Sequence, residues 1–261
     1  MNIVVCVKQV PDTALERTLK ADDSTVDRTV DAVINELDEY AIEEGLRLAE
    51  ASGGEVTILS MGPPKASESI RKALSMGADK AVHLVDDGLA GSDAVATSAA
   101  IAAVLGRIGF DLVILGSEST DARMGVLAAM LSERLGVPQL SLASKVEIDG
   151  QAIRIHRQAD YGYDKVEASL PAVVSVVEKI NEPRYPSFKG IMAAKKKPVE
   201  TLSLADLADA GIDPASVGLA ASGTEVVSFA MRPPRQAGTI VKDEGDGGAK
   251  AAEFLAAQKF I

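Results

Sequence analysis

Short runs of β-branched and aliphatic residues alternate with helical patterns through the first half of this 261-residue chain. The apolar runs have the length of strands that are buried on both faces of a sheet. Helices of about 10 to 16 residues, between strands, are typical of right-handed parallel crossovers. The pattern therefore predicts an α/β fold with a Rossmann-like, doubly wound, mostly parallel sheet. Strands are expected at residues 3–7, 56–59, 80–85 and 112–115, and helices at 37–52, 67–75, 94–105 and 122–135.

The second half of the chain departs from this alternation. Two short apolar runs flank Asp149-Gly150, which is a strong signal for a β-hairpin. Further strands are expected at residues 166–170 and 172–177. After Pro183 the alternation is expected to stop. The predicted organisation is an α/β domain over residues 1–183, followed by residues 184–261 as an arm that ends in a helix and packs on another chain.

The composition excludes several classes of function. Lys and Arg number 27 against 38 Asp and Glu, and the resulting net charge of −11 is unfavourable for binding nucleic acid. Cys6 is the only cysteine, which excludes a disulfide framework and a multi-cysteine metal site. The N-terminus has no signal-peptide pattern, and no apolar run reaches the roughly 18 residues of a transmembrane helix. We therefore expect a cytoplasmic protein without a transmembrane segment.

Ligands of open parallel sheets bind beyond the carboxyl ends of strands, where helix N-termini present free amide groups. The richest strand end is residues 116–121, Gly-Ser-Glu-Ser-Thr-Asp, directly before the helix predicted at 122–135. Its hydroxyl groups, and the small Gly125, suit a phosphate-binding loop. The alternative is that these side chains only cap the helix, and spacing alone favours that alternative. The absence of a Walker motif and of GxGxxG after the first strand argues against nucleotide hydrolysis and ordinary dehydrogenase chemistry.

The other reactive side chains have simpler structural interpretations. Cys6 ends an apolar strand, where a small core residue is commoner than a nucleophile. His83 lies in an alternating strand pattern and His156 between arginines, and neither has a nucleophile beside it. The lysine run at 195–197 suits a solvated surface, but in an acidic protein a basic patch near Phe188 also suits a partner surface.

Five stretches, in the same order along nearly the whole chain, together resemble the small, or beta, subunit of the electron transfer flavoproteins. They are residues 3–12 (IVVCVKQVPD), 35–44 (NELDEYAIEE), 60–63 with 73–79 (SMGP and ALSMGAD), 111–116 (DLVILG) and 170–197, which contains LPAVVSV, NEPRY and IMAAKKK. The last stretch is the most specific of the five.

This resemblance implies one half of a heterodimer, in which the alpha subunit mainly holds the redox-active FAD. The complex would accept electrons from acyl-CoA dehydrogenases of fatty acid β-oxidation or from other flavoprotein dehydrogenases, and would pass them to a quinone reductase or a similar acceptor. The beta subunit would be an electron carrier without catalytic residues of its own. It would bind AMP, which has no redox role and supports assembly.

The resemblance also implies site residues. Those matching the family's AMP pocket are Cys6, Asn35, Glu36, Leu37, Asp38, Met61, Gly116, Ser119, Thr120, Asp121, Met124, Gly125 and Val126. The Asn35 amide would read polar edges of the adenine or ribose, while Cys6 and Met61 would pack against apolar surface. The hydroxyl-rich loop would take the phosphate, so that Ser119 and Thr120 become ligands.

The family's recognition loop, which docks a partner dehydrogenase, corresponds to residues 185–197. Phe188 stands at the anchor position, where many members carry leucine, and the implied docking residues are Phe188, Ile191, Met192, Lys195, Lys196 and Lys197. Residues 233–235 (Pro-Pro-Arg) and the last helix resemble the arm that reaches over the alpha subunit. One departure is Gln158, which replaces a glutamate that in some members helps to fix the docked geometry.

Two alternatives to the simple carrier follow from the same residues. The first is an electron-bifurcating subunit that binds a second FAD in place of AMP. The second is a stand-alone nucleotide-binding regulator with the same sheet architecture. A self-sufficient domain has no use for the recognition loop and the arm, which argues against the regulator. The short loop after Gly116 favours a monophosphate over a diphosphate.

Overall fold

The computed structural model describes residues 1–261 except 232, 235–237 and 239, and the described residues form two compact units. The first unit is Met1–Val226, and the second is Val227–Ile261. Residues 184–226, which the sequence analysis grouped with the arm, belong to the first unit by their contacts. Arg235, part of the Pro-Pro-Arg stretch assigned to the arm, lies outside the described residues.

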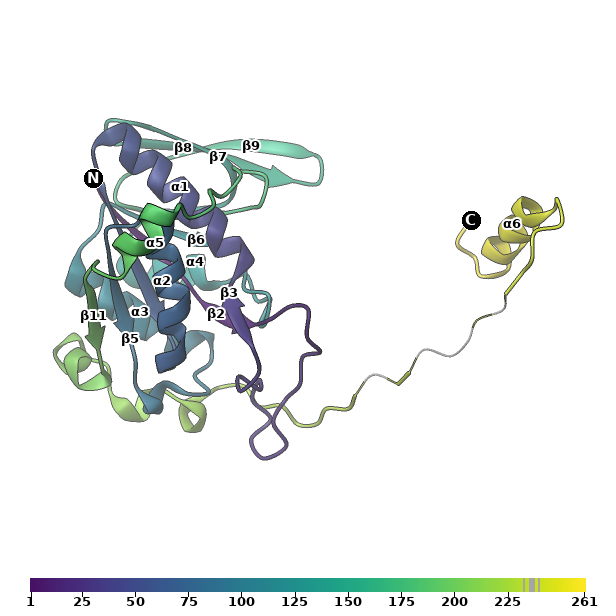
Figure 1. The fold of residues 1–261 in the computed structure, drawn as a ribbon, viewed down its shortest axis with the longest axis horizontal. Helices are drawn as coiled ribbons and strands as arrows, with labels where there is room; N and C mark the ends of the chain where they lie inside the picture. The colour runs from purple at the N-terminus through teal and green to yellow at the C-terminus, as the bar shows by residue number, and fades with distance from the viewer. Residues whose placement is uncertain (232, 235–237, 239) are drawn as a thin grey trace. The chain divides into compact units, whose positions relative to one another are not determined.

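A nine-stranded sheet lies at the centre of the first unit, with the strand order β11-β5-β4-β1-β6-β10-β7-β8-β9 (Figure 1). Neighbouring strands from β11 to β7 are parallel, whereas β7, β8 and β9 pair antiparallel. A separate small sheet pairs β2 with β3. The strands are β1 Asn2–Cys6, β2 Gln9–Pro11, β3 Ala32–Ile34, β4 Glu55–Met61, β5 Lys80–Leu84, β6 Leu112–Gly116, β7 Gln139–Asp149, β8 Ala152–Ala159, β9 Gly162–Ser169, β10 Ala172–Val176 and β11 Val199–Leu202.

Helices cover both faces of this sheet (Figure 1). The α-helices are α1 Glu36–Ser52, α2 Ser67–Met76, α3 Ala94–Ile108, α4 Leu127–Leu135, α5 Phe188–Ala194 and α6 Gly247–Ala257; the 3-10 turns are Pro64–Ala66, Asp87–Leu89, Leu204–Ala210, Pro214–Ser216 and Leu219–Ala221. Successive side chains of β1 point to opposite faces. Ile3 and Val5 pack with residues of α1 and α2, whereas Val4 and Cys6 pack with residues of α3 and α4. The alternation of apolar residues thus fills two separate cores.

The predicted doubly wound, mostly parallel sheet with added hairpin strands is confirmed. Two local expectations are wrong. The helix predicted at 122–135 begins only at Leu127, because Arg123 and Gly125 have φ values of 50° and 63°, which a right-handed helix does not contain. The alternation also continues after Pro183, since α5 and β11 follow and β11 pairs with β5. The four residues of β11 are half polar, which gives only a weak strand signal.

The strand order creates a crevice beside β1. From β1 the chain proceeds through β4 to β5 on one side, and then returns to β6 on the other side. A reversal of this kind separates the connections above the carboxyl ends of the strands, and open α/β sheets bind ligands at that point. The segments that follow β1, β4 and β6 therefore define the candidate site.

The second unit contains α6, and none of the residues of this helix is buried. Its apolar side chains and those that follow it, Phe254, Leu255, Phe260 and Ile261, are all exposed. An apolar helix that buries nothing gains little stability from packing within its own unit.

Candidate functional site

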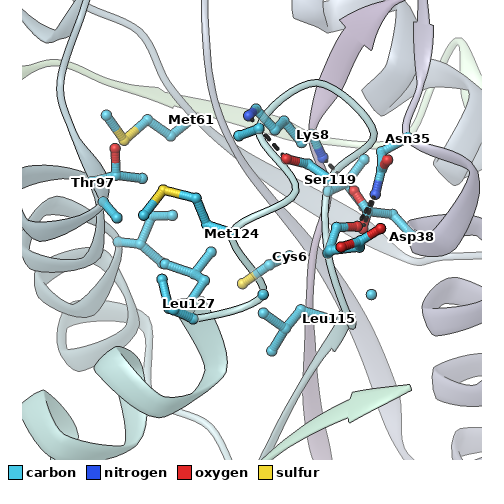
Figure 2. A pocket seen from close by; sticks show the side chains of 18 of the residues that line it. Cys6, Lys8, Asn35, Asp38, Met61, Thr97, Leu115, Ser119, Met124 and Leu127 are labelled. Carbon is cyan, nitrogen blue, oxygen red and sulfur yellow. Dashed lines mark hydrogen bonds between the residues drawn. The ribbon is translucent and has the colours of Figure 1, made fainter. Parts of the chain in front are cut away.

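A cavity of about 260 Å³ opens at the carboxyl ends of β1, β4 and β6, where the strand order reverses (Figure 2). Figure 2 shows Met61, Met124 and Leu127 on one side of it, and Lys8 and Ser119 on the other. One wall therefore offers apolar and sulfur-containing surface, while the other offers an ammonium group and a hydroxyl group. This arrangement suits a flat apolar group that carries a polar, anionic substituent.

The loop between β6 and α4 (residues 117–126, the β6–α4 loop) forms much of the cavity wall. Its backbone turns through the left-handed region at Arg123 and Gly125 before α4 begins at Leu127, with Val126 at the N-cap position. Ser119 therefore lies too far from the helix to cap it. The prediction that the hydroxyl and carboxylate side chains at 119–121 cap this helix is wrong, because the loop is longer than the sequence pattern indicates.

Asp121 is the electrostatic centre of the β6–α4 loop. Its side chain is 1% exposed, and its carboxylate accepts from Lys8 Nζ at 2.8 Å and from Arg28 Nη2 at 2.6 Å. Burial opposes the charge of Asp121, but the charges and hydrogen bonds of Lys8, Ser119 and Arg28 outweigh it and hold its pKa well below the usual range. Lys8 and Arg28 remain more than a third exposed, so the ion pairs fix two cations beside the cavity.

Asp38, on the first turn of α1, is buried at the polar end of the cavity. Its oxygens accept from the Lys8 backbone N–H at 2.7 Å and from Asn35 Nδ2 at 2.9 Å. Burial raises the pKa of Asp38 to about 7, although hydrogen bonds from Asn35, Lys8 and the Gly116 backbone oppose the increase. Burial, and then the charge of Asp38, raises the pKa of the Cys6 thiol to about 12, so Cys6 is not a nucleophile at neutral pH.

The cavity brings together most of the predicted binding residues. Those that line it are Cys6, Asn35, Asp38, Met61, Gly116, Ser119, Met124, Gly125 and Val126. Glu36, Leu37, Thr120 and Asp121 do not line it. Leu127, at the end of the stretch from Gly116 that matches the family's pocket, lines the cavity as well, whereas Lys8 and Thr97 were missed as binding residues. A signal for Lys8 existed, because it is the cation nearest to the end of the first strand and strand ends carry the ligands in this fold.

Residues 185–197 (segment 185–197) contain the predicted docking residues, and the structure exposes its apolar members. Phe188 is 80% exposed, and Tyr185, Ile191 and Met192 are exposed as well. Lys195 and Lys196 are also exposed. Lys197 differs, because its Nζ donates to the carbonyl groups of Leu74, Gly77 and Ala78 at 2.6 to 3.0 Å, at the end of α2.

Fold and site together define a ligand-binding class of doubly wound α/β protein. The chain has an open, doubly wound α/β sheet with a ligand-sized crevice at the reversal of its strand order, and an exposed apolar segment. In the described residues no group of His, Cys, Asp and Glu is placed to hold a metal ion. Nor does that part of the chain contain a helix with the length and apolarity that crossing a membrane requires.

Comparison with known proteins identifies the family. The family model "Electron transfer flavoprotein domain" matches residues 23–207. The electron transfer flavoprotein subunit beta of Mycobacterium tuberculosis is 53% identical over 267 aligned positions, which cover 100% of this chain and 99% of the relative. The subunit of the same name from Megasphaera elsdenii is 33% identical, with 100% of both chains covered. The caffeyl-CoA reductase-Etf complex subunit CarD of Acetobacterium woodii is 35% identical, with 92% of each covered.

The chain therefore belongs to the electron transfer flavoprotein family, and within it to the beta subunits. It is an electron-carrier subunit rather than an enzyme.

Proposed function

We propose that this chain, as the beta subunit of a heterodimeric electron transfer flavoprotein, binds AMP in the cavity at the ends of β1, β4 and β6. The observation that carries the proposal is the two-sided cavity, with an apolar wall at Met61 and Met124 and the Lys8 ammonium opposite. Adenine is flat and largely apolar on its faces, whereas a phosphate group seeks cations, hydroxyl groups and backbone N–H groups.

Two features of the β6–α4 loop fit a phosphorylated ligand. Ser119 Oγ lies 3.3 Å from Lys8 Nζ, so a hydroxyl group and an ammonium group converge. The backbone N–H groups of Met124, Gly125 and Val126 have no acceptor among the described residues. A group with several acceptor oxygens would accept from these N–H groups and from the Ser119 hydroxyl.

The size of the cavity favours AMP over a second FAD. The cavity volume of about 260 Å³ lies just below the roughly 300 to 1,000 Å³ of typical ligand pockets. A dinucleotide needs room for a second ring system and a second phosphate. We keep the electron-bifurcating arrangement, with FAD in this cavity, as the second candidate, because two cations, Lys8 and Arg28, stand beside the cavity.

Segment 185–197 is proposed to dock flavoprotein dehydrogenases, acyl-CoA dehydrogenases of fatty acid β-oxidation among them. Phe188 presents an exposed aromatic side chain at the start of α5, and such residues anchor small interfaces. Lys195 and Lys196 would steer an acidic partner surface. The relative from Acetobacterium woodii is named as a subunit of a caffeyl-CoA reductase-Etf complex, which supports a redox enzyme acting on a CoA ester as the class of partner.

The alpha subunit is proposed as the second partner, and it would mainly hold the FAD through which electrons pass to a quinone reductase or a similar acceptor. Phe254, Leu255, Phe260 and Ile261 are exposed in the second unit and need a partner surface to be buried. In functional terms, residues 1–183 supply the nucleotide site, whereas residues 184–261 supply the surfaces that meet other proteins.

The nucleotide content of the complex tests this proposal. The chain is co-expressed with its alpha subunit, and the heterodimer is purified and denatured to release FAD and AMP for quantification. One FAD and one AMP per heterodimer is the expected result. Two FAD and no AMP would replace the simple carrier by the bifurcating subunit. One FAD without AMP would show that the cavity does not hold the nucleotide.

A further inference from the structure

Asn35 occupies the N-cap position of α1 without acting as a cap. An asparagine at this position normally accepts a hydrogen bond from a backbone N–H of the first turn, which stabilises a helix by about 1 kcal/mol. The Asn35 side chain makes no such bond. Its amide is instead directed at the β6–α4 loop, more than 80 positions further along the chain.

The hydrogen bonds of Asn35 use both of its amide hydrogens. Nδ2 donates to the Glu118 carbonyl at 3.0 Å and to Asp38 Oδ1 at 2.9 Å, and Oδ1 accepts from the Thr120 backbone N–H at 3.0 Å. The residue is only 1% exposed. A ligand in the cavity therefore finds no free N–H on Asn35 and almost no accessible surface.

Asp38 completes this connection. Its Oδ1 accepts a hydrogen bond from Asn35 Nδ2, and its Oδ2 accepts one from the Lys8 backbone N–H. The carboxylate therefore connects the residues that follow β1 to the Asn35 amide, which in turn binds the loop. The Gly116 backbone is so close to Asp38 that a Cβ at this position would lie 2.7 Å from Oδ1. Gly116, just before the loop, therefore lies against Asp38, and the backbone of Glu118 and Thr120 is hydrogen-bonded to Asn35.

The far side of the loop is held by charge. Asp121 is buried, and both of its oxygens are engaged by Lys8 and Arg28, which come from segments before α1. A carboxylate with both oxygens committed and almost no exposure is unsuited to contact a phosphate group. Asn35 and Asp121 therefore grip the loop at Glu118 to Asp121 from two sides, one by hydrogen bonds to backbone and one by ion pairs.

We propose that Asn35, Asp38 and Asp121 are positioning residues, which hold the β6–α4 loop in its ligand-binding shape and do not themselves contact the nucleotide. For Asn35 this replaces the role of reading the adenine or ribose. The expected loss of AMP affinity on changing these residues rests on the proposed function, whereas the expected loosening of the loop does not. The contacts to the ligand then fall to Lys8 Nζ, Ser119 and the loop backbone.

Hydrogen exchange of the full chain, freed of nucleotide, separates positioning from direct contact. Asn35→Ala removes both bonds to the loop, and the amides of residues 117–126 should exchange roughly tenfold faster or more, since each lost bond exposes a backbone group to opening. AMP affinity, measured by calorimetry on the same proteins, should fall together with this protection. Ser119→Ala should weaken AMP binding and leave loop exchange in the nucleotide-free chain unchanged.

Asn181→Ala is the matched control. Asn181 is a partly buried asparagine whose Nδ2 donates to the Tyr40 carbonyl and to Glu44 Oε2, away from the loop. It should alter protection near α1 and leave residues 117–126 as in the wild type. If Asn35→Ala yields too little folded protein, Asp121→Asn tests the ion pairs of Asp121 with Lys8 and Arg28, because it keeps the shape of the side chain and removes its charge. Its expected result is faster exchange of the same residues.

The outcomes decide between the roles. Weaker AMP binding by Asn35→Ala with unchanged loop exchange would make Asn35 a ligand and overturn the proposal. Unchanged exchange in both Asn35→Ala and Asp121→Asn would overturn it as well. Faster loop exchange in a chain whose wild type binds no AMP would uphold the positioning role and refute the nucleotide assignment.

Discussion

The β6–α4 loop and segment 185–197 both lie outside the regular sheet, and they are held in opposite ways. The loop is gripped in its middle, at Glu118, Thr120 and Asp121, by side chains from earlier in the chain. Segment 185–197 is fixed at its ends and packs one side of α5 closely on α2, where Gly190 lies against the Ser75 carbonyl and Ala194 is buried, but it leaves its other side exposed. Arg184, just before it, pairs with Glu43 and Glu50 of α1.

The other end of the segment is fixed to α2. Arg71 Nη1 donates to the Ala194 carbonyl at 2.6 Å, and Lys197 binds the last carbonyl groups of that helix. Phe188 and Met192 between these ends stay exposed. Gripping the middle gives a loop a fixed concave shape for a small ligand. Packing only one side of α5 on α2 leaves the apolar side chains of its other side accessible, as the proposed docking of a protein partner requires.

The largest expected effect comes from removing the exposed side chain of Phe188, the proposed anchor of segment 185–197. Phe188→Ala should slow reduction of the heterodimer by a flavoprotein dehydrogenase roughly 30-fold or more at limiting concentration, as expected for a central interface anchor. FAD and AMP content should be unchanged, because Phe188 does not line the cavity and the FAD is proposed to be held mainly by the alpha subunit. Stopped-flow reduction kinetics measure the effect, with the nearby Lys189→Ala as control. Wild-type kinetics in Phe188→Ala would remove the anchor role.

Loosening an end of segment 185–197 tests whether its ends are needed. Arg184→Ala leaves Glu43, whose side chain is 8% exposed, without its cation. The folded state should lose roughly 2 kcal/mol, less than for a fully buried pair because Arg184 is itself about a third exposed. Urea unfolding gives the value, and Lys196→Ala is the control for loss of a surface cation. A decrease in the free energy of unfolding below about 0.5 kcal/mol would mean that the Arg184–Glu43 pair does not fix this end of the segment.

The pH dependence of stability sharpens the account of the loop. With the pKa of Asp38 raised to about 7 in the folded state, against 3.8 ordinarily, the folded protein holds a proton there that the unfolded chain has lost. Between about pH 4 and 7 the contribution of Asp38 to stability therefore falls as pH rises, by at most about 1.4 kcal/mol per pH unit.

Asp38→Asn does not titrate, so the stability advantage of the wild type over this variant should shrink as pH rises through that range. Urea unfolding at pH 4.5, 5.5 and 6.5 measures it. Asp209→Asn, at the surface, controls for the change in net charge. A constant advantage across the range would contradict a raised pKa.

The smallest expected effect comes from the backbone of the loop. Gly125 has φ +63°, and a Cβ added there would lie 3.6 Å from the Ser117 carbonyl oxygen, so Gly125→Ala has space but an unfavourable conformation. It should cost about 1 kcal/mol in unfolding free energy. Gly106→Ala, in α3 with open space around it, should instead stabilise the protein by about 0.5 to 1 kcal/mol. Equal effects of the two changes would mean that the conformation of Gly125 is not required.

The sheet was predictable because burial on both faces leaves a direct mark on composition. Strands such as Leu112–Gly116 read as continuous apolar runs, and the helices between them have the spacing of crossovers. β11 was not predictable in this way. Its exposed Glu200 and Thr201 break the apolar run, and only its pairing with β5 makes it a strand.

The location of the cavity could be predicted from the sequence, but the role of each residue in it was less predictable. Strand ends and the hydroxyl-rich stretch located the cavity, and its Cys6, Met61 and Ser119 do line it. The direction of the Asn35 side chain was not readable, because the sequence shows an asparagine where a cap belongs. The true partners of Asn35, Glu118 and Thr120, lie more than 80 positions away, and only the folded chain brings them into reach.

The pairing of β11 with β5 has a consequence for the order in which the molecule is completed. Val199 stands beside Ala81, 118 positions earlier in the chain, so this edge of the sheet can form only after most of the protein has been synthesised. Contacts of such long range carry a high cost of loop closure and form slowly. Segment 185–197 lies between β10 and β11, so it is synthesised only shortly before this edge strand. The docking proposed for this segment would therefore become available only when the subunit is almost complete.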